Sequence, residues 1–439
     1  MTDFFLSLWR FDVLTQYALI LLAIVTVGGA LVSLNTLRQE IATGIIGKRD
    51  THRFAILGIL CVIGFAAALL TKNILVLWIA LEIVTVCTAL VIAFYKRPNS
   101  GQAAWNYIRL STIGVIVMFV GLIFLVKIGI ATGLSPWDAL SLDALRVAAP
   151  NFSAPTLKIA FALIFLGFGT KMGLVPLHTW AAEAYSKISS PMSGFLAAML
   201  PLTVLIALLR IRQIVDTNLN DGGTWTGRLF LVFGIVSIVV TALTLIRQKN
   251  YKRMTSTLAL HHSGLTVFMI GLGPAGMIPA LIHAFTQALV TSGLFAATGI
   301  IHGTYKTSKF SGVQNMLSVL PTTAVLMMIL AAAALAVPFS GFFTSEVVGL
   351  GYGLQENFWV TLLALIAVIL AAACLLRFVL TMLLPSTEAA PIALQPGQWK
   401  LSNAVLALHV LIIFALGAYV STQSGIRVVI TAVQTVGGL

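Results

Sequence analysis

The stretch that decides the fold is GFGTKMGLVPLHTWAAEAYSKISSP, residues 167–191. It follows an apolar run over residues 157–166, so Lys171 lies inside a predicted membrane helix, and Pro176 should end or kink that helix. An isolated lysine at bilayer depth costs roughly 2.5–3.5 kcal/mol, so a chain keeps one where it faces a partner or a water-filled path. The alternative is that Lys171 snorkels to the helix exit, where His178 stands. Because other polar groups recur inside the apolar runs, we favour a functional role.

The composition defines the class of protein. The chain has 439 residues, of which 59% are hydrophobic and 9% charged, and its mean hydropathy is +1.02. These values exclude a soluble globular domain and predict an all-α polytopic membrane protein with a single transmembrane domain over residues 1–439. We interpret the net charge of +13 as the basic bias of cytoplasmic loops, so no nucleic-acid partner is expected. Cys61, Cys87 and Cys374 lie in apolar runs without CxxC spacing, which predicts neither a metal site nor a disulfide.

Apolar runs along the chain predict about 12–13 transmembrane helices, two of them broken. A short interfacial helix is expected at residues 179–187, and the Gly-rich segment PFSGFFTSEVVGLGYG, residues 338–353, should break the helix that carries Glu346. The predicted spans are 13–34, 54–70, 74–94, 108–130, one that follows from the apolar run 157–166 and carries Lys171, 191–210, 228–246, one that begins near residue 254, 276–301, one that ends at residue 338, 358–384 and 401–420. The final stretch, residues 425–439, is apolar but short.

Basic residues concentrate in alternate loops, at residues 38–53, 96–97, 247–253 and 306–309. Loops rich in Lys and Arg stay on the cytoplasmic side of a membrane. We therefore expect these four loops to share the cytoplasmic face.

Four ionisable groups within or beside the predicted spans carry the expected chemistry: Glu82, Lys171, His283 and Glu346. Gln287 is four residues after His283, so both share one helix face. Acid, amine and imidazole groups linked by water are what a proton relay requires. The alternative for each is a packing ion pair or a hydrogen-bonded core histidine.

Ordinary catalysis is not indicated by the sequence. It contains no nucleophile elbow, phosphate-binding loop, dinucleotide fingerprint, haem ligand set or iron–sulfur ligand set, so we expect no catalytic centre, cofactor or metal in this chain. His261 and His262 are adjacent and should point in different directions on a helix.

Several motifs resemble one family. GTKMGLVPLHTW (169–180) and KRMTSTLALHHSGL (252–265) resemble motifs of the antiporter-like subunits of respiratory complex I and of Mrp-type antiporters. HAFTQALVTSGLF (283–295) resembles a broken helix of that family, and PFSGFFTSE (338–346) resembles a second one. Residues 77–108, LWIALEIVTVCTALVIAFYKRPNSGQAAWNYI, are similar to component F of hydrogenase-4. The similarity covers about residues 55–385 and leaves C-terminal helices over 386–439.

The resemblance implies roles for matching positions only. Glu82 matches the glutamate that pairs with the helix lysine, Lys171 matches that lysine, His283 matches the histidine of the second broken helix, and Glu346 matches the charged residue at the outlet. The proton pathway that we expect consists of Glu82, Lys171, His178, His262, His283, Gln287 and Glu346.

The chain also departs from the family pattern. Gln287 stands where many relatives carry a lysine, and Pro201 and Leu202 stand where some relatives carry another. Only two helices fit ahead of Glu82, fewer than in relatives with fourteen. The middle of the expected path is therefore less charged than in a typical pump.

The resemblance implies a proton-translocating membrane subunit, or one that moves Na⁺, in a multi-subunit energy-converting complex of the cell inner membrane, closest to hydrogenase-4 or complex I. Other membrane and peripheral subunits would perform the redox chemistry. One alternative is the proton-flux subunit of an inorganic-carbon (CO2/bicarbonate) uptake complex with a zinc-binding partner. Another is a structural anchor that does not pump.

Overall fold

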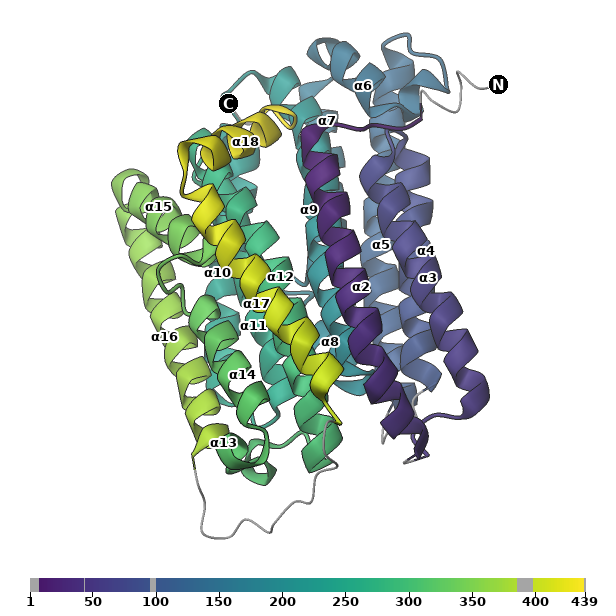
Figure 1. The fold of residues 1–439 in the computed structure, drawn as a ribbon. Coiled ribbons are helices and arrows are strands. Elements are labelled where there is room, and N and C mark those ends of the chain that lie inside the picture. Colours follow the sequence, from purple (N-terminus) through teal and green to yellow (C-terminus); the bar gives the residue numbers. More distant parts are fainter. Residues whose placement is uncertain (1–7, 43, 95–99, 385–397, 438–439) are drawn as a thin grey trace.

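The computed structural model of this chain describes residues 8–42, 44–94, 100–384 and 398–437. Long helices run side by side through the molecule, and short helices lie across one end of the bundle (Figure 1). The predicted all-α polytopic membrane fold is confirmed. Two predicted features, the basic residues at 96–97 and the prolines at 385, 391 and 396, lie outside the described residues.

The first half of the chain contains six long helices and the shorter elements between them. They are α2 (Val13–Ala42), α3 (Lys48–Leu70), α4 (Ile74–Phe94), α5 (Ser100–Ala131), η1 (Asp138–Leu140), α6 (Leu142–Ala148), η2 (Ala149–Asn151), α7 (Ala154–Met172), α8 (Thr179–Lys187) and α9 (Ser190–Leu219). The helix predicted at residues 179–187 is present with these bounds.

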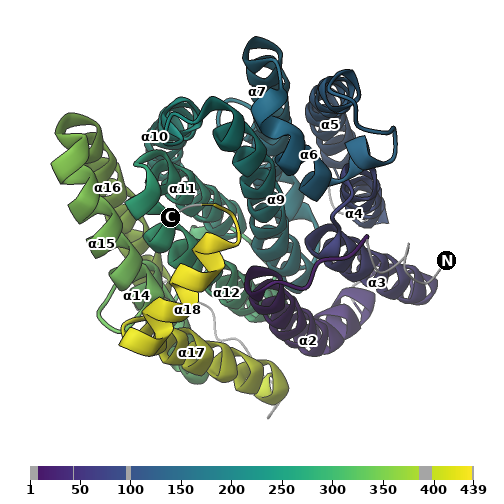
Figure 2. The same ribbon diagram turned by 90° about the horizontal axis from the view of Figure 1, so that it is seen from above.

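The second half continues the bundle and ends in a short helix across its end. Its helices are α10 (Thr224–Ile246), α11 (Tyr251–Gly271), α12 (Pro274–Tyr305), η3 (Phe310–Gly312), α13 (Met316–Val319), α14 (Pro321–Ala334), α15 (Gly341–Glu356), α16 (Phe358–Leu383), α17 (Lys400–Val420) and α18 (Gln423–Gln434). α18 lies over the same end of the bundle as α6 (Figures 1 and 2).

Ten helices of the described residues are long and apolar enough to cross a membrane, against the predicted 12–13. The difference has two causes. α11 has the length, at 21 residues, but begins YKRMTSTLALHHS and is too polar to be recognised by composition. α14 and α15 have 14 and 16 residues and together form one interrupted crossing. With these two added, the bundle has twelve crossings.

Two helices form the centre of the bundle. In the most apolar 18-residue stretch of each helix, all of α9 and 94% of α12 are buried inside the protein, against only 28% of α16. Seen from above, α9 and α12 lie between the α3–α5 group and the α14–α16 group (Figure 2). Polar side chains on these two helices therefore face protein, while α16 presents an apolar surface suited to lipid.

Side-chain caps fix where three helices begin. The Asn73 carboxamide oxygen accepts hydrogen bonds from the first turn of α4, and Asn250 does the same for α11. The Ser340 hydroxyl accepts from the Phe343 backbone N–H at the start of α15. Such caps satisfy backbone donors that have no partner inside the helix. They set the register of the helices that carry Glu82, His262 and Glu346.

One of the two predicted helix breaks occurs at the lysine helix. α7 ends at Met172, where Gly173 adopts the left-handed conformation with φ of 74°. Pro176 then stands in the break before α8, as predicted. Pro lacks the N–H that a continuous helix needs, and Gly tolerates the positive φ that ends one.

The second break differs from the prediction in position. It lies at residues 335–340, between α14 and α15, and the glycine-rich part that follows is helical. A Cβ on Gly341 would overlap the hydroxyl of Thr286 on α12. The first of these glycines therefore allows α15 to approach α12 closely, rather than interrupting α15 itself.

The expectation that the His283 segment resembles a broken helix is wrong. α12 is continuous over 32 residues, even though Pro279 lies inside it. Neighbouring helices surround α12 on nearly all sides, and such packing tolerates the one backbone hydrogen bond that a proline removes. The two breaks therefore lie between α7 and α8 and between α14 and α15, and none lies within α12.

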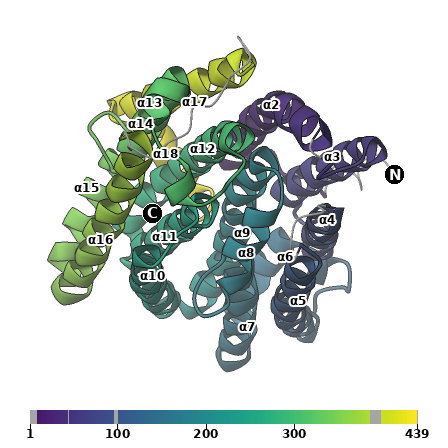
Figure 3. The same ribbon diagram turned by 90° about the horizontal axis from the view of Figure 1, so that it is seen from below.

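Three of the predicted basic loops lie at one end of the bundle, which Figure 3 shows from below. A β-bridge joins Asn250 to Lys309, and the Lys306 Nζ atom lies 3.4 Å from Gln39 Oε1 near the end of α2. The predicted grouping of these loops on one face is therefore present. That this face is cytoplasmic stays a prediction.

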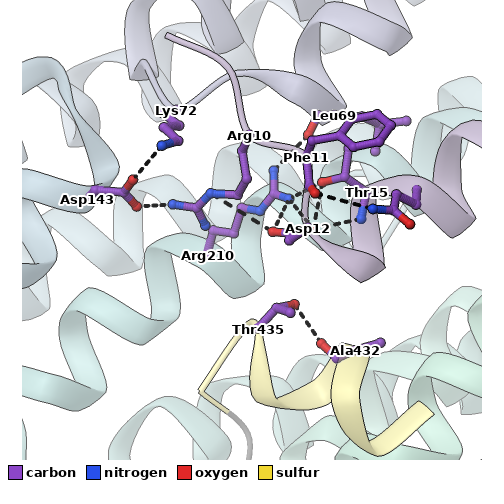
Figure 4. A network of polar contacts seen from close by, with 11 residues as sticks. Arg10, Phe11, Asp12, Thr15, Leu69, Lys72, Asp143, Arg210, Ala432 and Thr435 are labelled. Atoms are coloured by element: carbon purple, nitrogen blue, oxygen red, sulfur yellow. Dashed lines mark hydrogen bonds and ion pairs between the residues drawn. The ribbon is translucent and has the colours of Figure 1, made fainter. Parts of the chain in front are cut away.

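An ion-pair network holds the N-terminal segment at the opposite end (Figure 4). The Arg210 Nη2 atom of α9 lies 3.1 Å from Asp12 Oδ2, and Arg10 pairs with Asp143 of α6. Lys72 Nζ also lies 3.3 Å from Asp143 Oδ2. The network ties α2, α6 and α9 together where the bundle meets its short helices.

Candidate functional site

Lys171 lies in a buried polar cluster between α4, α5 and α7. Its side chain is 1% exposed, and its Nζ atom lies 3.7 Å from Glu82 Oε1. The ammonium donates hydrogen bonds to the Ser111 hydroxyl at 2.8 Å and to the Thr85 hydroxyl. The structure thus brings Lys171 and Glu82 together as an ion pair, and it points Lys171 into the protein rather than toward an interface.

Glu82 forms the outer side of this pair. Its side chain is 27% exposed, while that of Lys171 is almost completely covered. Its Oε1 atom is buried and has no hydrogen-bond partner in the described part of the chain. At 3.7 Å the two charged groups attract each other, but their separation is longer than a usual hydrogen bond. The lysine is therefore held by hydroxyls, and the carboxylate is the looser partner.

A second cluster gathers at the centre of α11, α12 and α15. The His262 Nδ1 atom lies 3.1 Å from His283 Nε2, and His283 Nδ1 lies 3.0 Å from the Ser345 hydroxyl. Ser345 precedes Glu346, which is 8% exposed. The Phe342 ring stacks on His262 with centroids 4.2 Å apart. Three of the predicted site residues, from three helices, thus come together here.

Gln287 links the histidine cluster to a polar stripe on α11. Its Nε2 atom donates to the Ser263 hydroxyl at 2.7 Å and to the Ala259 carbonyl at 2.9 Å. His283 and Gln287 therefore face the same helix, as their spacing predicted. His261 points away from this cluster, since its Nδ1 atom lies 3.1 Å from Thr241 of α10.

A small cavity lies between the two clusters. Its volume is about 10 Å³ for the centre of a water molecule, which is at the lower limit for holding one water. Met172, next to Lys171, lines one side, and Gln287 and Ser263 line another. Pro201 and Leu202 of α9 also line it. The positions where the resemblance implies a missing lysine thus lie at the gap in the polar path.

His178 is separate from both clusters. It is half-buried at the start of α8, and its Nδ1 atom has no hydrogen-bond partner among the described residues. The structure places it in the break that follows Lys171. Its part in the path stays a prediction.

Sequence reasoning missed the hydroxyls that complete each cluster. Thr85 is three residues after Glu82, and this spacing in the sequence already places both on one helix face. Ser345 adjoins Glu346 in the chain. Ser111 carries no such signal, because it meets Lys171 from 60 residues away.

The sequence matches a known protein family. Residues 71–372 match the family described as "NADH:quinone oxidoreductase/Mrp antiporter, TM". The matched segment contains Glu82, both clusters and both helix breaks.

Curated relatives match at low identity. The chain is 28% identical over 288 residues to "Hydrogenase-4 component F homolog" of Methylacidiphilum infernorum, covering 64% of this chain and 59% of the relative. It is 25% identical to "NAD(P)H-quinone oxidoreductase chain 4 1" of Synechococcus elongatus, covering 65% of this chain and 52% of the relative. The match thus spans little more than half of the length of these relatives.

Solved structures share the fold. A chain of the Mrp complex from Dietzia sp. DQ12-45-1b superposes with a TM-score of 0.80 at 16% identity, over 98% of this chain and 84% of that one. A chain of the archaeal membrane-bound sulfane sulfur reductase gives 0.79 at 22% identity, over 93% and 84%. A chain of respiratory complex I from Thermus thermophilus with bound NADH gives 0.78 at 19%, over 98% and 86%. All three come from multi-subunit membrane complexes.

Proposed function

Because the chain belongs to the NADH:quinone oxidoreductase/Mrp antiporter transmembrane family, we propose that it is the proton-translocating subunit of a multi-subunit energy-converting complex. The complex is of the hydrogenase-4 or complex I type and lies in the cell inner membrane. Protons move along a mid-membrane axis from the Glu82–Lys171 pair to the His262–His283 pair and Glu346. Other subunits carry out the driving reaction.

The buried Lys171–Glu82 pair carries this proposal. Two unit charges about 4 Å apart attract by about 4 kcal/mol at an effective dielectric constant of 20. That attraction is comparable with the roughly 2.5–3.5 kcal/mol cost of one charge at bilayer depth. Pairing therefore keeps Lys171 protonated, and separating the pair favours release of the proton. A lysine with only a packing role would gain nothing from a burial cost and an attraction to Glu82 that are so nearly equal.

The exposed part of Glu82 supports the presence of partner subunits. A carboxylate on a membrane-spanning helix that keeps 27% of its side-chain surface exposed would face lipid if the chain stood alone. Charges in that position are costly and are normally covered by protein or water. A neighbouring membrane subunit packed on α4 would cover it.

Neither alternative function gains support from the described residues. The inorganic-carbon uptake interpretation needs a zinc-binding partner, and nothing among the described residues identifies one. The structural anchor interpretation would make the Lys171–Glu82 contact a packing ion pair, and such a buried pair is often no more stable than the apolar residues that could replace it.

Proton uptake into proteoliposomes that contain the whole complex tests the proposal. Lys171→Met and Glu82→Gln should each abolish coupled uptake while the complex still assembles, because each removes one member of the pair. Lys158→Met is the matched control, since Lys158 lies near the other end of α7 beside Trp225. It should leave uptake unchanged. Normal uptake by both pair variants would refute the proposed role.

A further inference from the structure

The histidine cluster has the geometry of a set of metal ligands. His262 Nδ1 and His283 Nε2 are 3.1 Å apart, and one ligand atom from each of His262, His283 and Glu346 lies within 4.8 Å of the other two. Zn²⁺ binds imidazole nitrogen at about 2.0–2.1 Å and carboxylate oxygen at about 2.0–2.2 Å, so ligands of one ion stand roughly 3–3.5 Å apart. We propose that His262, His283 and Glu346 form a binding site for a divalent transition-metal ion such as Zn²⁺. A bound ion would occupy the lone pairs of both histidines, so the site and the proposed proton path through them are used in different states of the protein.

The hydrogen bonds of Ser345 prepare His283 to be a ligand. The Ser345 hydroxyl donates to the Phe342 carbonyl at 3.1 Å, so its oxygen accepts from His283 Nδ1–H. The lone pair of His283 is then on Nε2, which faces His262. Histidine ligands of metals usually donate their other ring N–H to such a partner, which fixes the tautomer and the orientation of the ring.

His262 can supply its lone pair through a change of tautomer. In the metal-free cluster, Nδ1–H of His262 donates to His283 Nε2. Its own Nε2 is buried and has no hydrogen-bond partner in the described part of the chain. Moving the proton from Nδ1 to Nε2 frees the Nδ1 lone pair for the ion, and no hydrogen bond at Nε2 is lost. The stacked Phe342 ring holds the imidazole plane during this change.

The ligand set selects the class of ion. Two imidazoles and one carboxylate suit Zn²⁺ and similar transition metals, whereas Na⁺, Mg²⁺ and Ca²⁺ are hard ions that prefer oxygen ligands. Three protein ligands leave a fourth position for water or an anion. With neutral imidazoles and one carboxylate, a divalent ion leaves one net positive charge, which a hydroxide or chloride in that position cancels. Glu346 is the most exposed of the three, so the ion approaches from its side.

Metal binding by the purified full-length chain in detergent tests this site without any transport assay. Co²⁺ is the probe, and we expect one ion per chain with the visible absorption of a four-coordinate site, displaced by Zn²⁺. Ser345→Ala should weaken binding roughly tenfold or more, as expected for loss of an outer hydrogen bond. His283→Gln and Glu346→Gln should weaken it further. His261→Gln and His409→Gln, which alter buried histidines outside the cluster, should leave it unchanged.

Three outcomes would overturn the site: no Co²⁺ binding by the wild type, binding that survives both His283→Gln and Glu346→Gln, or equal loss in the His261→Gln control. Glu346→Gln changes the shape of its side chain very little, so it remains informative if His283→Gln does not fold. The Co²⁺ assay measures binding and does not depend on proton uptake. A failure of the metal site can therefore be told apart from a failure of the proposed transport.

Discussion

At the scale of single residues, the partners of Lys171 suit a group that gains and loses a proton. A hydroxyl can accept from an ammonium and can also donate to a neutral amine, whereas a carboxylate stabilises only the charged form. Ser111 and Thr85 can therefore hold the lysine in both states. Glu82, at 3.7 Å, is the partner whose approach or retreat changes the balance.

In the proposed pathway, the histidine cluster carries the proton through the middle of the membrane. Imidazole can accept and donate on opposite nitrogens, and the His262–His283 contact lines up two of them. If the path is used, His283→Ala should block proton uptake by the complex in proteoliposomes. Gln287→Lys should be tolerated or should alter the pH dependence of uptake, because it restores a charge beside the cavity.

The matched control for this prediction is His409→Ala. His409 is also buried, but it lies on α17 and bonds to the Val405 carbonyl of its own helix. Uptake by the control should equal that of the wild type. Equal uptake by His283→Ala as well would remove the relay and leave the anchor interpretation standing.

At the scale of elements, α15 depends on a close approach to α12. Gly341→Ala should destabilise the protein by about 1–3 kcal/mol, the usual cost of forcing a methyl group into a packed interface. The hydroxyl in its way belongs to Thr286, a β-branched side chain with little freedom to move. Thermal unfolding in detergent would measure the loss.

Gly351 offers a control on the same helix. A Cβ at Gly351 would meet no atom within 4 Å, so Gly351→Ala should leave stability unchanged or raise it by up to about 1 kcal/mol through helix propensity. A similar loss for both variants would mean that the contact with α12 does not set the position of α15.

The ion-pair network at the N-terminal end predicts a pH dependence. Burial raises the pKa of the Asp12 carboxyl, but the Arg210 charge and the hydrogen bonds from Thr15 lower it by more, so the pKa lies below its usual value. A depressed pKa means that the stabilisation is complete above the unfolded value, about 4, and is lost as pH falls through the folded value. Melting temperature should therefore fall in acid more steeply for the wild type than for Asp12→Asn. Parallel melting curves would contradict this role.

At the scale of the whole molecule, the polar path consists of two clusters joined by a cavity that is barely large enough for one water. Moving a charge against a membrane potential requires about 2.3 kcal/mol per 100 mV. Transport along such a path needs the cavity to widen or to fill with water at one stage of the cycle. Leu202 and Pro201 of the central helix α9 are the side chains that would have to give way.

The orientation in the membrane is a second property of the whole molecule. Loops at 247–253 and 306–309 share one end, and the rule for basic loops predicts that this end is cytoplasmic. A cysteine introduced at the exposed Lys249 should react with an impermeant reagent only from the cytoplasmic side. A cysteine at Thr217, at the other end of the α9–α10 pair, should react only from outside. The reverse pattern would overturn the orientation.

Much of this architecture could be predicted because membrane helices leave strong local signals. Apolar length located the spans, and a lysine followed by glycine and proline located the first break, whereas the Lys171–Glu82 pair was predicted only through the family resemblance. Contacts between distant segments leave no such signal, so His262, His283 and Glu346 could be assigned to one pathway through the resemblance, but their direct contact could not be predicted from the sequence. The glycine-rich segment that begins near Gly341 was predicted to break its helix. A glycine in a sequence does not show whether it ends a helix or allows a close contact between two helices.

The partial exposure of Glu82 has a consequence for how the cell must make this protein. If the chain is inserted before the subunit that packs on α4, the Glu82 carboxylate would lie against lipid. Such an unassembled subunit would be unstable and open to degradation. Synthesis in step with the neighbouring subunit would avoid that state. The acid assigned to the proposed transport axis would then also act as a checkpoint on assembly, since only a completed complex would cover it.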